Sequence, residues 1–99
     1  MYLDNYITEI RKLCQQNSVR RLYAFGSVLT DRFNDKSDVD FLVDIEGENA
    51  LERGEKYFNV LFALQDMLNR NVDLLEEKAI RNKYLKFEID RTKQVLYAG

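Results

Sequence analysis

An alternating stretch between positions 39 and 45 constrains the fold of this chain more than any other feature. Every second residue from Val39 to Ile45 is apolar, and the positions between hold Asp40, Leu42 and Asp44. A period of two predicts a β-strand with one apolar face. A slip of one residue would turn that apolar set toward solvent, so burial determines the register of the strand. We therefore expect a sheet with a buried face.

Helical periodicity flanks this strand on both sides. Apolar side chains recur at helical spacing in residues 2–16 and 50–69, and Ile80, Tyr84 and Phe87 mark another helix. Phe58 and Phe62 widen the apolar stripe of the 50–69 helix, and we expect most of the aromatic residues to pack in the core. Runs of β-forming residues predict the other strands, at 19–25, 72–75 and 95–97.

This order of elements predicts an α/β (α+β) fold, a small mixed β-sheet with helices packed on one face. A length of 99 residues fits one domain, residues 1–99. The net charge is −2, so bulk electrostatic binding to nucleic acid is not expected. No apolar run approaches the ~20 residues that span a membrane, and the first residues do not resemble a secretion signal. We expect a cytoplasmic protein.

Two residue counts limit the chemistry. The chain has no histidine, which excludes Ser–His and Cys–His catalysis and any histidine-ligated metal. Cys14 is the only cysteine, so neither an internal disulfide nor a cysteine–zinc site is possible. It lies on the apolar stripe of the first helix, where we expect it to be buried. Any bound metal would have oxygen ligands, which favours Mg²⁺, Mn²⁺ or Ca²⁺.

Asp38 and Asp40 are the strongest candidates for such ligands. They are two residues apart at the start of the alternating strand, so both side chains leave one face, ~6.6 Å apart along the strand. Two unpaired carboxylates there would repel each other, and a divalent cation would turn that repulsion into a binding site. A solvated strand end is the simpler alternative for each. Asp44 lies further along the same face, and we expect it to be a solvated strand end.

Gly26 and Ser27 form a second candidate site. They end the strand at 19–25, where glycine permits a close backbone approach and serine can begin a helical turn. Free N–H groups at such a turn bind phosphate oxygens. An ordinary turn is the alternative. Ten residues separate Ser27 from Asp38, which would place a phosphate cradle beside the carboxylate pair.

The combination Gly26-Ser27, ten residues, then Asp38-Val39-Asp40 resembles the pattern of the DNA polymerase β-like nucleotidyltransferases. The match is nearest to their minimal single-domain type (MNT) and spans nearly the whole chain, which implies their fold. The resemblance implies that Asp73 is a third carboxylate, which completes the metal site and accepts the proton of the attacking hydroxyl.

Two parts of the family pattern are less direct. Glu76 and Glu77 are alternatives for the third ligand, although strand alternation favours Asp73. The Arg-Gly that many members carry after the serine is missing here. Arg32 and Lys36 are therefore the candidates for basic phosphate contacts, with solvated loop charges as the alternative.

The resemblance also implies an activity and a partner. Two Mg²⁺ ions and ATP would serve transfer of AMP to a tyrosine hydroxyl of a HEPN ribonuclease toxin, which the chain would neutralise as an antitoxin within a hetero-oligomer. A small hydroxylated acceptor, such as an antibiotic, is one alternative. An antitoxin that acts by stoichiometric binding without catalysis is another.

Overall fold

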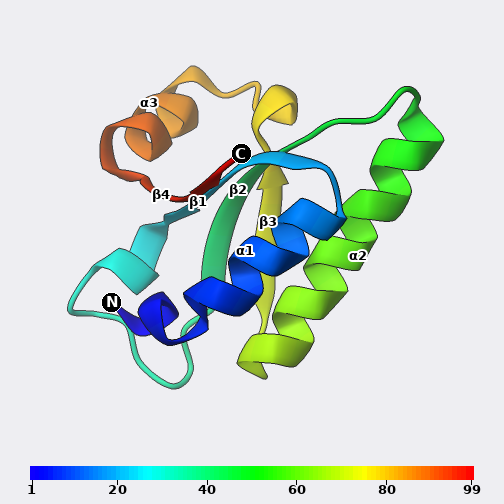
Figure 1. Ribbon diagram of the computed structural model, residues 1–99. Coiled ribbons are helices and arrows are strands. Elements are labelled where there is room, and N and C mark those ends of the chain that lie inside the picture. Colours follow the sequence, from blue (N-terminus) through cyan, green and yellow to red (C-terminus); the bar gives the residue numbers. More distant parts are fainter.

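A four-stranded mixed sheet forms the centre of the molecule in the computed structural model, which describes residues 1–99 (Figure 1). Its strands are β1 (Val19–Phe25), β2 (Val39–Ile45), β3 (Val72–Glu76) and β4 (Gln94–Ala98). Their spatial order is β3-β2-β1-β4. β2 runs parallel to β3 and antiparallel to β1, while β4 is antiparallel to β1 at the far edge. The predicted mixed sheet is confirmed.

Three helices accompany the sheet. They are α1 (Ile7–Gln16), α2 (Ala50–Leu68) and α3 (Lys83–Thr92), and short 3₁₀ turns occupy Tyr2–Tyr6, Gly26–Leu29 and Glu77–Ala79. The side chain of Asn49 accepts a hydrogen bond from the backbone N–H of Glu52 and so begins α2. Asn69 ends that helix in the left-handed conformation, with φ 51°. The left-handed conformation of Asn69 explains why the helix predicted at 50–69 ends one residue earlier, at Leu68.

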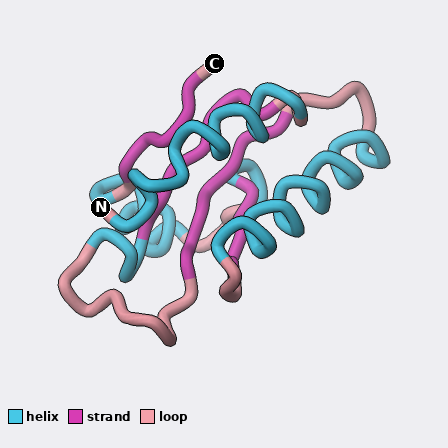
Figure 2. Tube along the Cα trace, turned by 60° about the horizontal axis from the view of Figure 1, so that its bottom comes forward, coloured by secondary structure: helices cyan, strands magenta, loops and turns pink.

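α1 and α2 pack side by side on one face of the sheet, as Figure 2 shows, and their apolar stripes form the main core. Cys14 lies in this core, fully buried, and burial raises the pKa of its thiol to about 12. The thiol is therefore unreactive at neutral pH. The hydroxyl of Tyr57 on α2 donates to the Leu74 carbonyl of β3 at 2.6 Å, which ties the helix to the strand. The predicted helical layer on one face is thus confirmed for α1 and α2.

The opposite face of the sheet holds buried side chains that are separate from the main core, among them Leu42. It carries Tyr23 and Leu42, which are paired across β1 and β2, together with the neighbouring Asp40. Just after α3, Lys93 places its Nζ 4.3 Å from the centre of the Tyr23 ring, so the end of α3 lies near this face. Ile89 is the single buried residue of α3 and lies outside the main core. No helix of the molecule has both the length and the apolar character needed to cross a membrane.

Several aromatic side chains depart from the expected core packing. Phe58 and Phe62 on α2 are 51% and 56% exposed, and Tyr84 and Phe87 on α3 are 87% and 64% exposed. Both pairs point away from the sheet, because other residues fill the inward sides of their helices. Ile80 lies before α3 rather than inside it, since the Asn82 side chain accepts from two backbone N–H groups and starts the helix at Lys83.

Candidate functional site

Parallel pairing of β2 with β3 brings two of the sequence candidates together. Asp40 and Asp73 are register partners on neighbouring strands, so their side chains leave the same face. Asp38 lies one residue before β2 and is exposed. Asp40 and Asp73 on the two strands, and Asp38 just before β2, thus lie at the edge where β2 and β3 both begin. Glu76 lies three residues beyond Asp73, on the opposite face of β3, and is therefore the weaker alternative.

The electrostatics of this edge centre on Asp40. Burial raises the pKa of its carboxyl above the usual value, and the negative charges of Asp73 and Asp38 raise it further. A cation would relieve this repulsion, and the donors are all carboxylate oxygens, which suit Mg²⁺. No three acidic side chains already converge on one point as metal ligands. The chemistry of the three carboxylate donors nevertheless fits a magnesium ion.

Gly26 lies directly against this carboxylate group. Its φ of +77° belongs to the left-handed region, which side chains other than glycine's rarely adopt. A methyl group added there would overlap Oδ2 of Asp40. The neighbouring residue, Phe25, is the register partner of Asp40 across β1 and β2. Two separate features thus require glycine at position 26: its left-handed backbone conformation and the space that Asp40 occupies.

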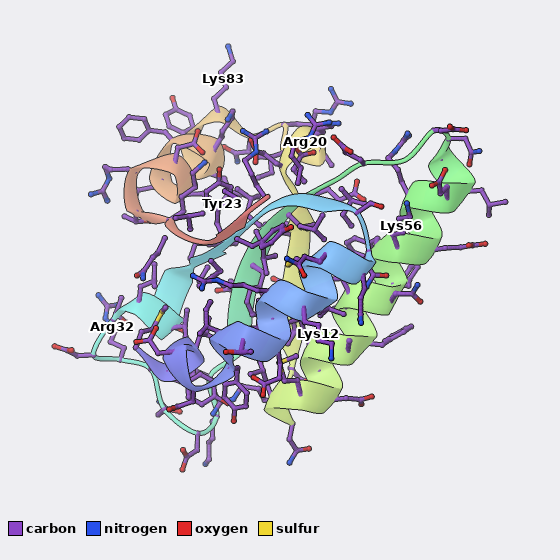
Figure 3. The ribbon with its side chains drawn as sticks, viewed as in Figure 1. Lys12, Arg20, Tyr23, Arg32, Lys56 and Lys83 are labelled. Carbon is purple, nitrogen blue, oxygen red and sulfur yellow. The ribbon has the colours of Figure 1, made fainter.

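A cavity of about 510 Å³ opens beside this glycine. The residues that line it are Gly26, Ser27, Leu29, Thr30, Arg32 and Thr92. The short turn begins at Gly26, with Phe25 at its N-cap position, so the expectation that Ser27 begins it is wrong. The Ser27 carbonyl accepts from both the N–H and the hydroxyl of Thr30, each at 2.9 Å. Arg32, labelled in Figure 3, is thus brought to the candidate phosphate cradle. Lys36 does not line this cavity; its backbone N–H bonds to the Asn34 side chain within the loop.

Arg70 is a residue of this region that sequence reasoning missed. Its Nη1 donates to the carbonyls of Asn34 at 3.1 Å and Ser37 at 2.8 Å, and Ser37 directly precedes Asp38. Its guanidinium also lies 4.8 Å from the Tyr2 ring centre and 4.6 Å from that of Phe33. Arg70 therefore holds the loop that leads into Asp38. No local pattern marks it, because its partners come from other parts of the chain.

Asp44, expected to be a solvated strand end, is instead 3% exposed. Burial alone would raise the pKa of its carboxyl, but the hydrogen bond from Arg21 and the charges of Lys78, Arg20 and Arg21 hold that pKa below its usual value. Arg21 Nη2 lies 3.0 Å from Oδ2, and Lys78 Nζ lies 3.6 Å from Oδ1. Basic residues from neighbouring segments explain the burial, so Asp44 is a structural anion. Glu77 raises the pKa of Arg21 by its charge, which places it near this cluster rather than with Asp40.

Solved structures share this fold. A minimal nucleotidyltransferase superposes with a TM-score of 0.76 at 25% identity, covering 94% of this chain and 91% of that one. A toxin–antitoxin complex with AMP-PNP superposes with a TM-score of 0.70 at 22% identity, covering 94% and 73%. A tri-AMPylated Shewanella oneidensis HEPN toxin in complex with its MNT antitoxin gives 0.62 at 19% identity, covering 97% and 72%.

Sequence comparison agrees with the structural one. Two proteins of Methanocaldococcus jannaschii that carry the name protein adenylyltransferase are 31% and 34% identical to this chain. The first alignment covers 73% of this chain and 71% of its relative, and the second covers 79% and 76%. The family model described as polymerase beta, nucleotidyltransferase, matches residues 8–99. The chain therefore belongs to the polymerase β nucleotidyltransferase family.

Proposed function

We propose that this protein is an Mg²⁺-dependent adenylyltransferase that moves AMP from ATP to a tyrosine hydroxyl of a HEPN ribonuclease toxin and so acts as its antitoxin. The observation that carries the proposal is the register pair Asp40–Asp73 beside Gly26. It joins a cation-binding carboxylate group to a glycine–serine turn suited to phosphate. Nucleotidyl transfer requires both parts at one place.

Each candidate residue has a part in this reaction. The backbone N–H groups of the Gly26–Ser27 turn hold the triphosphate, with Arg32 as the nearby cation. Asp38 and Asp40, with Asp73, would hold Mg²⁺, and the ion would stabilise charge on the phosphates and lower the pKa of an incoming hydroxyl. The hydroxyl oxygen bonds to the α-phosphorus, the bond to the β-phosphate oxygen breaks, and pyrophosphate leaves. Asp73 accepts the hydroxyl proton, since the chain has no histidine for that step.

The relatives support a protein acceptor. Those of M. jannaschii are named for adenylyl transfer to protein, and the S. oneidensis structure contains an AMPylated HEPN toxin. A partner protein would bring its own tyrosine to the site.

Intact-mass spectrometry tests the proposal. The protein is incubated with the HEPN protein encoded beside it, ATP and Mg²⁺, and the partner should gain the mass of one AMP per modified hydroxyl. Asp38→Asn and Asp40→Asn should abolish the gain, whereas Asp66→Asn, at an exposed aspartate of α2, should not. An unmodified partner in the presence of ATP and Mg²⁺ would contradict the proposal.

Two alternatives give different results. If a small hydroxylated molecule is the acceptor, radiolabel from ATP will appear on members of an aminoglycoside panel without any protein acceptor. If binding alone neutralises the toxin, the double variant Asp38→Asn with Asp40→Asn will still suppress its ribonuclease activity. Loss of suppression in that variant, with complex formation retained, supports catalysis.

A further inference from the structure

The outward side of α3 carries a group of exposed apolar side chains. Tyr84 and Phe87 are 87% and 64% exposed, and their spacing of three residues places them on the same side of the helix. Leu85 beside them is 43% exposed. Large side chains exposed together in this way mark interaction surfaces more often than isolated ones do.

One end of α3 reaches the cavity beside Gly26. Thr92, the last residue of α3, lines that cavity together with Gly26 and Ser27. At 1.5 Å per residue, Phe87 and Tyr84 lie about 8 Å and about 12 Å along the helix axis from Thr92. A protein seated on the outward side of α3 would therefore need only a few residues of chain to bring a hydroxyl to the cavity.

Charged side chains surround the exposed apolar residues of α3. Lys86 and Lys93 both pair with Asp90, at 3.0 and 2.9 Å, and Arg91 pairs with Glu88 at 2.7 Å. Residues 81–93 contain five lysines and arginines but only two carboxylates, Glu88 and Asp90, so the segment keeps a net charge of +3 and favours an acidic partner. Apolar residues with a rim of charged ones are typical of protein–protein interfaces.

Two cations at the start of α3 remain without an ion pair. Arg81 and Lys83 are both exposed, and no carboxylate lies within ion-pair distance of either. Figure 3 shows Lys83 extending away from the molecule at the end of α3 that is far from the cavity. A partner that meets this end would therefore carry an acidic group there.

We infer that the outward side of α3 is the docking surface for the acceptor protein, which presents an apolar patch flanked by acidic residues. The inference rests on the proposed function, since it assigns the surface to the protein that receives AMP. Tyr84 and Phe87 supply the apolar contacts, and Arg81 and Lys83 supply the charge at the rim. Docking there directs the acceptor hydroxyl toward Thr92 and the Gly26–Ser27 turn.

Binding measurements that do not depend on catalysis test this docking surface. The probe is the neighbour-encoded HEPN protein with its acceptor tyrosine replaced by phenylalanine, and titration calorimetry gives the Kd. The double variant Tyr84→Ser with Phe87→Ser should raise the Kd at least about tenfold. The matched control is Phe58→Ser with Phe62→Ser on α2, which removes two exposed aromatics remote from the cavity and should change the Kd less than about twofold.

Kinetics give a second readout. The α3 double variant should raise the KM for the acceptor protein and leave the KM for ATP unchanged, because no α3 aromatic lines the cavity. Arg81→Glu with Lys83→Glu should slow association, most strongly at low salt. Circular dichroism should show wild-type folding for these exposed positions.

Four outcomes overturn the inference. They are a Kd unchanged by the α3 variant, a larger effect of the α2 control, concentration-dependent self-association that the α3 variant removes, and tight RNA binding that it abolishes. Failure of AMP transfer by the wild type, with α3-dependent binding retained, would instead reject the proposed chemistry and keep the docking surface. The two proposals therefore fail in distinguishable ways.

Discussion

Replacing Gly26 with alanine tests the geometry of the site most directly. The added methyl group would occupy the space of Asp40 Oδ2, while the Cγ and Cβ of Asp40, at 3.4 and 3.6 Å, lie at ordinary contact distance. Only the end of a flexible side chain must move, so the carboxylate can rotate away. The substitution therefore displaces one carboxylate and leaves the sheet around it in place.

The expected magnitudes for stability and activity differ. Alanine at a φ of +77° costs about 1–2 kcal/mol of folding free energy. In a domain of this size, that lowers the melting temperature by roughly 4–8 °C per kcal/mol. A displacement of about 1 Å in a reacting group can lower the rate about 100-fold. We therefore expect a folded variant whose AMP transfer is lower by about two orders of magnitude.

Two matched substitutions separate strain from displacement. Asn69→Ala also places alanine at positive φ, 51°, but at the end of α2, so it should lose stability and keep activity. Gly54→Ala adds a methyl group with no atom within 4 Å, inside α2, and should stabilise the protein by about 0.5–1 kcal/mol. Thermal melts and initial rates below the melting transition supply both measurements. If folded Gly26→Ala transfers AMP within about twofold of the wild-type rate, the contact between Gly26 and Asp40 does not position the carboxylate.

Three further substitutions test other parts of the structure. The pKa of Asp40 is raised in the folded protein, so the stability of the wild type should fall as pH rises from about 4 to that raised value. The Asp40→Asn variant should not show this fall. Thermal melts across pH should therefore find it more stable than the wild type at neutral pH, although it is inactive. Asp44 has a lowered pKa, so its contribution is complete above pH ~4 and is lost as pH falls through the folded value. Asp44→Asn removes the ion pairs with Arg20, Arg21 and Lys78, and urea unfolding at neutral pH should show a loss of about 1–3 kcal/mol in unfolding free energy. The loss stays moderate because these partly exposed basic side chains regain water. An unchanged unfolding midpoint would contradict this role. Arg70→Lys keeps the charge but loses the planar contacts to two carbonyls and two rings, so kcat should fall while the KM for the acceptor stays constant; an unaltered kcat would remove Arg70 from the positioning of Asp38.

Local sequence patterns determined much of this protein. Alternation from Val39 to Ile45 specified the central strand and the face from which Asp40 leaves it, because burial permits only one register. Spacing then related Gly26-Ser27 to Asp38. Each prediction depended on residues close together in the chain, for which periodicity and turn chemistry are sufficient guides.

Tertiary structure decided what depends on distant partners. Parallel pairing of β2 with β3 places Asp73 opposite Asp40, and contacts between separate segments make Arg70 a clamp and bury Asp44 among basic residues. Tyr84 and Phe87 have helical spacing that is compatible with a core, yet only Ile89 of α3 is buried. Periodicity identifies the side chains that share one side of a helix, but whether that side is buried depends on the surface that the rest of the chain places against it.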